Sequence, residues 1–236
     1  MAVTLAQLRT RCQQRVDMVN SSFATTAEIN QLINTAGARL HALLVTAYED
    51  YFFKTTTFSL PAAETYDLSA NVTDLYKIIQ VFLTIGSGTS LSRFALRRFN
   101  ANEVPQFGNS AIFPATMILP VVYYCVQGGK MYFEPIPTSS NGYSVELWYA
   151  PQFTQLVNDT DTLDYSFAFG WEEYIVNDVA INLRLKEESD VSGLIARQNQ
   201  FEQQLQAIVQ NRDVAEASRV VDVDRRYSTG NLYAYY

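Results

Sequence analysis

The sequence predicts an α+β protein, with a body of four helices, an inserted antiparallel β-domain and an extended C-terminal arm. Apolar residues recur at helical spacing near both ends of the chain, whereas the period changes to two between about residues 55 and 150. The final stretch has neither period. The predicted boundaries are 1–53 for the N-terminal helices, 54–152 for the β-domain, 153–219 for a C-terminal helical hairpin and 220–236 for the arm.

Two amphipathic helices open the chain. Thr4 with Gln7, and Thr25 with Glu28, have the capping-box pattern, in which two side chains satisfy free N–H groups where a helix begins. An apolar stripe at helical spacing follows each cap, and the second stripe extends to about residue 51. Both stripes need an apolar partner, and the C-terminal hairpin is the predicted one.

A broad helix over about residues 167–188 is the predicted centre of the helical body. One apolar stripe repeats at every fourth position, in Trp171, Ile175, Val179 and Leu183. Acidic residues begin the helix and basic residues end it, which matches the helix dipole. A polar turn leads to a second helix with a mostly apolar seam, formed by Leu194, Gln198, Phe201, Leu205, Ile208 and Arg212. The short turn predicts an antiparallel hairpin.

The middle of the chain predicts strands. Residues 55–60 are rich in β-branched side chains and end at Pro61, and residues 66–68 are their predicted hairpin partner. A short helix is predicted over 97–104, and Gly128-Gly129 suits a tight hairpin turn. Further strands are predicted over 76–85, 91–96, 121–126, 130–133 and 143–149.

Composition limits the function. A net charge of -7 and a pI near 4.8 argue against wrapping around nucleic acid, which needs a positive surface. The sequence has no stretch of about 18 apolar residues, so no membrane span is predicted. The chain begins with a helix pattern instead of a signal peptide. Cys12 and Cys125 each lie in an apolar pattern, so we expect two buried free thiols in a reducing cytosol.

No catalytic constellation emerges from the residues. His41, the single histidine, lies at the edge of an apolar stripe without a nucleophile motif nearby, so we expect a packed or surface histidine. Asn158, Asp159, Asp161 and Asp164 are the densest oxygen cluster. That cluster lacks the Gly and Glu of a calcium loop, and a loop whose Asp side chains cap backbone groups is expected. We predict no cofactor and no metal.

Three further features are candidates for interaction with partners: an arginine cluster, a glutamine-rich helix and an aromatic C-terminal segment. Arg93, Arg97 and Arg98 form a basic cluster, for which a solvated face or an ion pair is expected instead of a phosphate site. The last helix is rich in glutamine, which fits a solvent surface or a contact between identical subunits. The final segment is either a frayed terminus or an arm that docks into a partner. The arm's anchors are Tyr227, Leu232, Tyr233, Tyr235 and Tyr236.

Several stretches, in this order, are similar to a known family: TLAQLRTRC, TTAEINQLINTAGARL, Tyr66-Asp67-Leu68, GGKMYFEPIP, VELWYAPQF, and NDTDTLD leading into WEEYIVNDVAINLRLKEESD. Over nearly the entire chain, the order of elements resembles the head-to-tail connector (adaptor) proteins of tailed bacteriophages. Each motif is a pattern of apolar and turn residues and not an invariant chemical signature.

The resemblance implies a non-enzymatic structural protein of the virion neck, made in the host cytoplasm. Such proteins form a ring, typically of twelve copies, beneath the portal. The ring extends the DNA channel without sequence-specific contact and provides the platform for the tail or nozzle protein. C-terminal segments in the family commonly reach the portal, a role that fits the tyrosine-rich arm by position and character. No membrane contact is implied.

Two other readings stay open. In a carbohydrate- or receptor-binding module, Trp148 and tyrosines of the β-domain would stack on the ligand, which predicts an exposed aromatic platform. A hydrolase using Asp159, Asp161 or Asp164 would show metal-dependent activity. The helical majority of the chain favours assembly over both.

Overall fold

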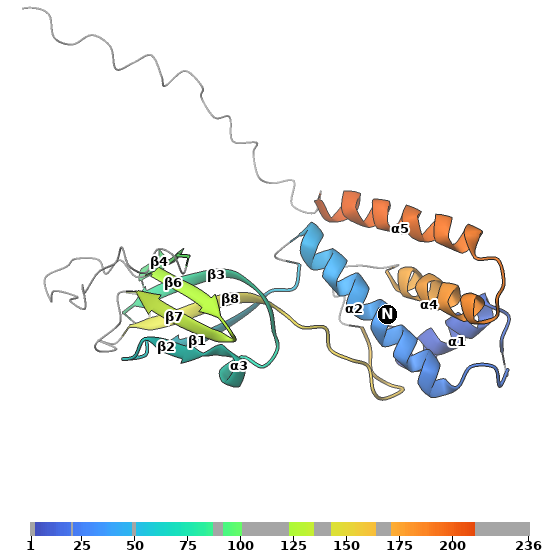
Figure 1. Cartoon of the computed structure of the whole chain (residues 1–236), viewed down its shortest axis with the longest axis horizontal. Helices are drawn as coiled ribbons and strands as arrows, with labels where there is room; N and C mark the ends of the chain where they lie inside the picture. Colours follow the sequence, from blue (N-terminus) through green and yellow to red (C-terminus); the bar gives the residue numbers. More distant parts are fainter. Residues whose placement is uncertain are drawn as a thin grey trace, which may run out of the picture.

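The computed structural model describes residues 3–19, 21–48, 51–86, 92–100, 123–134, 143–163 and 171–210, with side chains to residue 207. Helices α1, α2, α4 and α5 gather in one unit, and the strands together with the short helix α3 form another unit beside it (Figure 1). The helices are α1 (Leu5–Arg15), α2 (Thr26–Ala47), α3 (Leu68–Asn71), α4 (Glu172–Lys186) and α5 (Ser192–Gln210). The predicted mixture of α and β structure is therefore confirmed. None of the described helices is long and apolar enough to cross a membrane.

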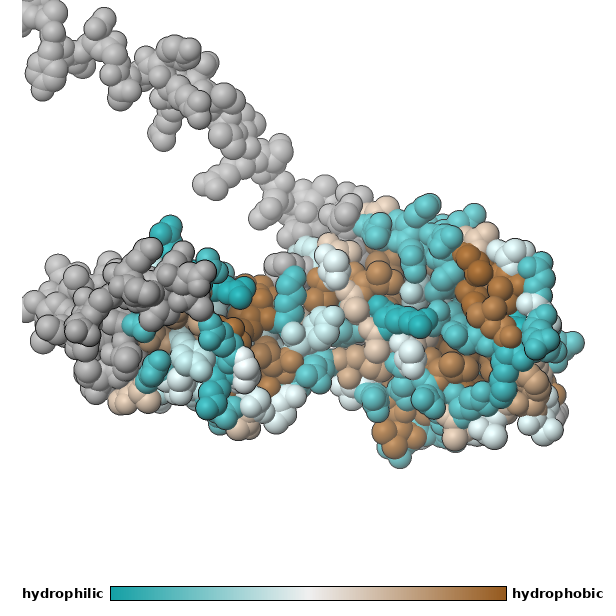
Figure 2. Space-filling model, in the orientation of Figure 1, coloured by the Kyte–Doolittle hydropathy of each residue, from teal (hydrophilic) through white to brown (hydrophobic). Residues whose placement is uncertain are grey.

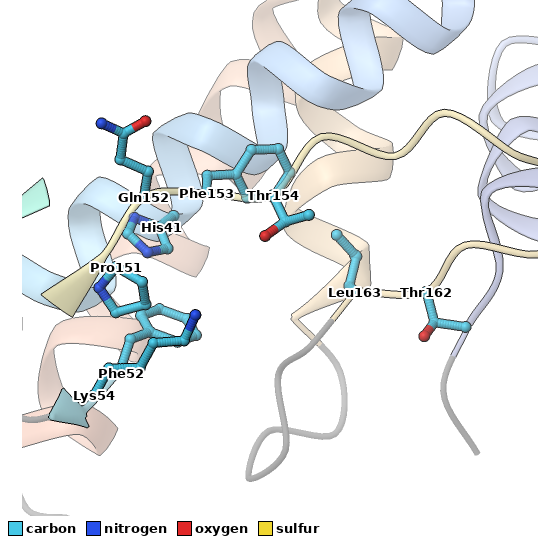
Figure 3. A pocket seen from close by; sticks show the side chains of 9 residues that line it. All are labelled: His41, Phe52, Lys54, Pro151, Gln152, Phe153, Thr154, Thr162 and Leu163. Carbon is cyan, nitrogen blue, oxygen red and sulfur yellow. The ribbon is translucent and has the colours of Figure 1, made fainter. Parts of the chain in front are cut away.

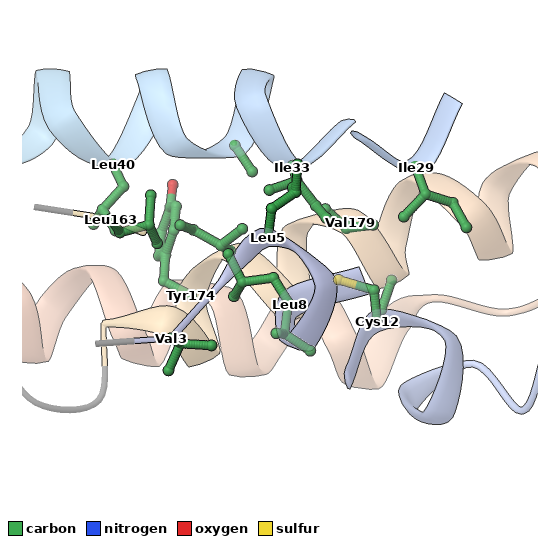
Figure 4. Close-up of a cluster of buried hydrophobic side chains, with 14 of the residues drawn as sticks. Val3, Leu5, Leu8, Cys12, Ile29, Ile33, Leu40, Leu163, Tyr174 and Val179 are labelled. Atoms are coloured by element: carbon green, nitrogen blue, oxygen red, sulfur yellow. The ribbon is translucent and has the colours of Figure 1, made fainter. Parts of the chain in front are cut away.

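Side chains from α1, α2, α4 and α5 share one hydrophobic core (Figure 4). The apolar stripes predicted for these helices supply it, and Leu8, Ile33 and Val179 are fully buried. The Thr4 hydroxyl accepts a hydrogen bond from the Gln7 N–H at 3.3 Å, and the Gln7 side chain accepts one from the Thr4 N–H at 3.1 Å. The first capping box is thus confirmed.

The second cap differs from its prediction in one bond. The Thr25 hydroxyl accepts from the Glu28 N–H at 3.2 Å, as expected. The Glu28 carboxylate instead accepts from Lys186 Nζ at 2.8 and 2.9 Å, which connects the first turn of α2 to the last turn of α4. A cation from another helix therefore takes the carboxylate that a local capping box would use.

Helix α4 is the most buried helix of the unit, as the breadth of its stripe predicts. It also buries Asn177 and Asp178, which the apolar stripe does not predict. The Asn177 side-chain amide donates to the Leu194 carbonyl at 2.9 Å and to Gln198 Oε1 at 2.8 Å, so a polar contact joins α4 to α5. On α5, Leu194, Phe201 and Leu205 pack on the core with Gln198 between them, which confirms this part of the seam.

The second unit is a two-layer β-structure around its own core. One sheet has the order β1-β8-β3-β4 and the other the order β2-β7-β6-β5. Apolar side chains such as Leu83, Phe133 and Leu147 fill the space between the layers. The strands are β1 (Lys54–Ser59), β2 (Thr65–Asp67), β3 (Leu75–Ile85), β4 (Ser92–Ala95), β5 (Arg97–Arg98), β6 (Tyr123–Gln127), β7 (Lys130–Glu134) and β8 (Ser144–Pro151).

The predicted hairpin between residues 55–60 and 66–68 is wrong. Strand β1 pairs with β8, and β2 pairs with β7 in the other sheet. Between them, the Leu60 N–H donates to the Tyr143 carbonyl and the Phe133 N–H donates to the Glu64 carbonyl, so the chain crosses from one sheet to the other. The crossing places Leu60, which is 1% exposed, in the core between the layers.

The predicted helix over 97–104 is wrong at its start, and residues 101–104 lie outside the described residues. Arg97 and Arg98 form β5, which pairs with β6 in parallel. Leu96 and Phe99 flank this strand, and both side chains are buried. Their N–H groups donate to the carbonyls of Val81 and Tyr124, which belong to different sheets. These long-range bonds use the donors that a local helix would need.

The glycine hairpin is confirmed. Gln127 pairs with Lys130 across a two-residue loop. Gly128 and Gly129 have φ angles of 55° and 78°, as a type I′ turn requires at both central positions. Side chains with a Cβ rarely adopt such angles, so glycine determines this turn.

Candidate interaction surfaces

An aromatic cluster joins the two units. His41 of α2 stacks on Phe52 with ring centroids 4.5 Å apart, and Tyr76 of β3 meets the imidazole edge-on at 5.4 Å. The Phe153 ring lies 6.3 Å from the imidazole. Phe52 and Phe153 belong to the two connections between the helices and the sheets. The packed position predicted for His41 is confirmed, and this histidine helps to hold the units together.

Two hollows adjoin this junction. One, of about 310 Å³, is lined by His41, Phe52, Pro151 and Thr162 among others (Figure 3). The other, of about 700 Å³, is lined by aromatic and uncharged polar residues and one alanine: Gln31, Asn34, Thr35, Ala38, His41, Tyr76, Gln152, Phe153 and Gln155. Within the described residues, His41 Nε2 is buried without a hydrogen-bond partner. Burial lowers the pKa of His41, and a hydrogen bond with the backbone of Pro151 opposes that shift.

The lowered pKa of His41 predicts that acid weakens the junction. The unfolded chain binds a proton on His41 near the ordinary value of 6.5, whereas the folded chain takes it up only at lower pH. The stability from neutral His41 is therefore complete above pH 6.5 and decreases as the pH falls through the folded-state pKa. His41→Phe keeps a ring on Phe52 and removes this titration.

We expect the free energy of unfolding of His41→Phe, relative to the unmodified chain, to increase between pH 7.5 and pH 5, in urea titrations at each value. A constant difference between the two proteins across this range would contradict the prediction.

The loop after β8 caps helix α1. Asp161 accepts hydrogen bonds from the N–H groups of Val157 and Asn158, both at 2.8 Å, and these bonds lower its pKa. The carbonyls of Asp161 and Asp159 accept from the first-turn N–H groups of Leu5 and Ala6. The predicted capping of local backbone groups is thus confirmed for the Asp161 side chain, whereas Asp164 lies outside the described residues.

The same loop is tied to α1 by an ion pair. Asp159 Oδ1 lies 2.6 Å from Arg9 Nη2. Of the three aspartates considered for hydrolysis, Asp159 and Asp161 are therefore engaged in structural contacts, and Asp164 lies outside the described residues. No group of three or more His, Cys, Asp or Glu side chains suited to a metal ion occurs among the residues that the structure describes.

The outer face of the β1-β8-β3-β4 sheet carries a buried carboxylate. Glu146 Oε2 accepts from Arg93 Nε at 2.7 Å, and Glu146 Oε1 accepts from Trp148 Nε1 at 2.8 Å. The rings of Phe53 and Phe82 pack against Trp148 at 5.1 and 4.7 Å. Arg93 thus makes an ion pair, as expected for the basic cluster. Trp148 is held by its neighbours and is only half-exposed.

Removing Arg93 is expected to destabilise the sheet. Arg93→Ala leaves the Glu146 side chain, which is 10% exposed, without its cation. Because the Arg93 side chain is itself 51% exposed, we expect a loss on the order of 1 kcal/mol and not the larger cost of a fully buried pair.

Thermal or urea unfolding measures this loss. Arg97→Ala is the matched control, and the further change Glu146→Gln should restore part of the loss because it removes the unpaired charge. Equal effects of Arg93→Ala and Arg97→Ala would contradict the importance of the pair.

Helix α5 exposes a broad surface without charge. Its 19 residues include two charged ones, Arg197 and Glu202. Both are engaged on the side of α4, since Arg197 lies 3.5 Å from Glu173 and Glu202 accepts from the Tyr174 hydroxyl at 3.2 Å. Figure 2 shows that the surface over α5 is mostly hydrophilic. We define the neutral face of α5 as the exposed residues Ala196, Asn199, Gln200, Gln203, Gln206 and Ala207.

A family model described as SU10 adaptor protein matches residues 3–229, which span both units. The chain belongs to the SU10 adaptor protein family. The comparison with curated proteins finds no match.

Membership of the SU10 adaptor family confirms the predicted resemblance to phage head-to-tail adaptors. The adaptor is a structural component of the phage virion, and it interacts with other head or tail proteins. The functional sites of the adaptor are therefore the surfaces through which it contacts those proteins. The predicted anchors Tyr227, Leu232, Tyr233, Tyr235 and Tyr236 lie outside the described residues, and the family match ends between the first and the second of them.

Sequence reasoning identified some of these surfaces and missed others. The glutamine-rich α5 was noted as a possible subunit contact, and the signal was the scarcity of charge in its sequence. The aromatic junction was missed because its members are separated by up to 112 residues, from His41 to Phe153. The burial of Glu146 was missed as well, since a charged residue in an alternating strand predicts an exposed position.

Proposed function

We propose that this SU10 adaptor forms a ring of twelve copies, as the resemblance to phage connectors implies, between the portal and the tail. The ring extends the DNA channel and provides the platform for the tail or nozzle protein. The observation that carries this proposal is the family match over residues 3–229, because it includes both the helical unit and the β-unit.

The two hydrophobic cores correspond to two proposed roles, one for the helical body and one for the inserted domain. The helices of residues 1–53 and 153–219 form a four-helix body, and residues 54–152 form an inserted domain that contacts a further ring. The separate hydrophobic clusters of the helices and of the strands support this division. A body with its own core can pack against its neighbours while the inserted domain meets a different protein.

The arm of residues 220–236 is proposed to attach the ring to the portal or to a neighbouring subunit. Tyrosine has an apolar ring and a polar hydroxyl, and this combination makes it a frequent anchor at protein interfaces. The proposed anchors are Tyr227, Leu232, Tyr233, Tyr235 and Tyr236.

We also expect the channel face of the ring to carry few Lys or Arg, because cations that bind phosphate would retard passing DNA. The net charge of -7 supports this expectation. A structure of the assembled neck measures it directly, and a continuous basic lining would contradict it.

Electron microscopy tests the proposed function. An affinity-tagged adaptor is expressed during infection by its phage, and the captured particles are imaged. The expected result is a ring of high rotational symmetry, joined to a second ring at one capsid vertex. Absence of the tagged chain from the neck of purified virions would contradict the proposal.

A further inference from the structure

The helical unit has two uncharged helix faces. The first is the neutral face of α5. The second, the neutral face of α2, comprises Ala27, Gln31, Thr35, Ala38, Ala42 and Thr46, which are exposed or half-exposed. The two charged side chains of α2 are both engaged with α4, since Glu28 binds Lys186 and Arg39 binds Asp178. Each face follows one side of a helix over several turns, at the spacing of three and four residues that places side chains together.

Uncharged polar faces of this length are unusual on a surface exposed to water. Charged residues make up 17% of the chain and, in folded proteins, stay mostly exposed. The central parts of protein interfaces are depleted of charge, because a charge that loses its water must find a partner. The composition of the two faces is therefore typical of surfaces that become covered.

Their chemistry fits each other. The amides of the α5 face offer donors and acceptors, and so do the Gln31 amide and the Thr35 and Thr46 hydroxyls of the α2 face, so the two faces can satisfy one another without a fixed charge pattern. The alanines let helix backbones approach closely. Beside the α2 face lies the 700 Å³ hollow, whose lining is uncharged apart from the histidine with a lowered pKa. Long side chains of another helix can enter such a hollow.

A closed ring needs two different contact patches on each subunit, since each copy meets one neighbour with each patch. Among the described helices of the helical unit, α1 carries three arginines and α4 is mostly buried, so α2 and α5 alone offer long neutral faces. We infer that the neutral face of α5 in one copy packs against the neutral face of α2 in the next copy. This inference rests on the proposed ring and assigns its subunit contact.

Cysteine cross-linking within virions tests the assignment. Thr35→Cys and Gln203→Cys are introduced on separate chains that are expressed together in the phage-infected cell, and purified virions are treated with a mild oxidant. The native Cys12 and Cys125 are buried, and burial raises the pKa of Cys12 to about 12, so they contribute little background.

The expected product is a disulfide-linked pair containing one chain of each type, formed more than about tenfold above either variant alone, because a disulfide requires Cα atoms within about 7 Å. No mixed pair, or equal yields from the single variants, would overturn the assignment.

A charge substitution provides a second readout. Gln203→Arg should lower incorporation of the adaptor into virions by about tenfold or more, since it places an unpaired charge within the contact. Gln14→Arg is the matched control, because Gln14 is an exposed glutamine on α1. Circular dichroism of the purified chains confirms that both variants fold.

The outcomes separate the two proposals. If the unmodified adaptor is absent from the neck, the proposed function fails. If it is present while Gln203→Arg is incorporated normally, the subunit contact alone is wrong. Normal incorporation of Gln203→Arg together with slowed DNA release would place α5 on the channel wall and would likewise overturn the contact.

Discussion

Deletion of residues 227–236 is expected to reduce attachment of the adaptor to the virion neck by about 30-fold or more. A single buried tyrosine anchor contributes on the order of 2 kcal/mol to an interface, and about 1.4 kcal/mol corresponds to a factor of ten in affinity. The deleted segment contains four tyrosines and one leucine that are proposed as anchors. Immunoblots of purified virions from cells that supply either chain measure the incorporated amount.

The matched control keeps the length of the arm. Ser228→Ala with Thr229→Ala changes polar residues between the proposed anchors and should be incorporated like the unmodified chain. The thermal unfolding midpoint of the truncated adaptor should stay unchanged, because both hydrophobic cores are formed by other residues. Normal incorporation of the truncated chain would show that the arm is not an anchor.

The second large effect is expected at the junction of the two units, where Phe153 packs on Gly37. A Cβ placed on Gly37 would lie 2.6 Å from Phe153 Cζ, closer than atoms in contact allow. Gly37→Ala should therefore displace the ring and destabilise the adaptor by about 1–3 kcal/mol, as overpacking does elsewhere. Phe153→Ala should cost about 2 kcal/mol, less than for a fully buried ring because Phe153 is only partly buried.

The double variant gives the sharper test. With Phe153 already reduced to alanine, Gly37→Ala meets no ring, and it should stabilise the helix by about 0.5–1 kcal/mol through the loss of glycine's backbone freedom. The sign of the substitution thus reverses between the two backgrounds, as urea unfolding measures. Gly193→Ala in α5 is the control, since a Cβ there meets nothing within 4 Å. Additive effects would contradict direct packing of Phe153 on Gly37.

The helices show what local sequence determines. The stripe of α4 predicts its burial, and the cap of α1 occurs with both of its predicted bonds. Gly128-Gly129 likewise predicts the hairpin between β6 and β7. In each case the deciding interactions join residues a few positions apart, so that composition and spacing contain nearly all the information.

The candidate sites likewise combine features visible in the local sequence with contacts that only the folded chain shows. The scarcity of charge in α5 is visible in the sequence, but its exposure is known only once Arg197 and Glu202 are seen to engage residues of α4. The Asp161 side chain caps nearby backbone groups as predicted, whereas the contact of the same loop with the start of α1, about 150 positions away, had no local signal.

The sequence by itself determined the class of the fold, the four long helices and their apolar faces, the glycine turn and the resemblance to phage adaptors. Tertiary structure alone decided that β1 pairs with β8, that residues 97–98 join a sheet, and that His41, Phe52, Tyr76 and Phe153 meet. The physical reason is the same in each case. A repeating pattern tells which side of an element avoids water, whereas the partner of that side is selected by packing among residues distant in the chain.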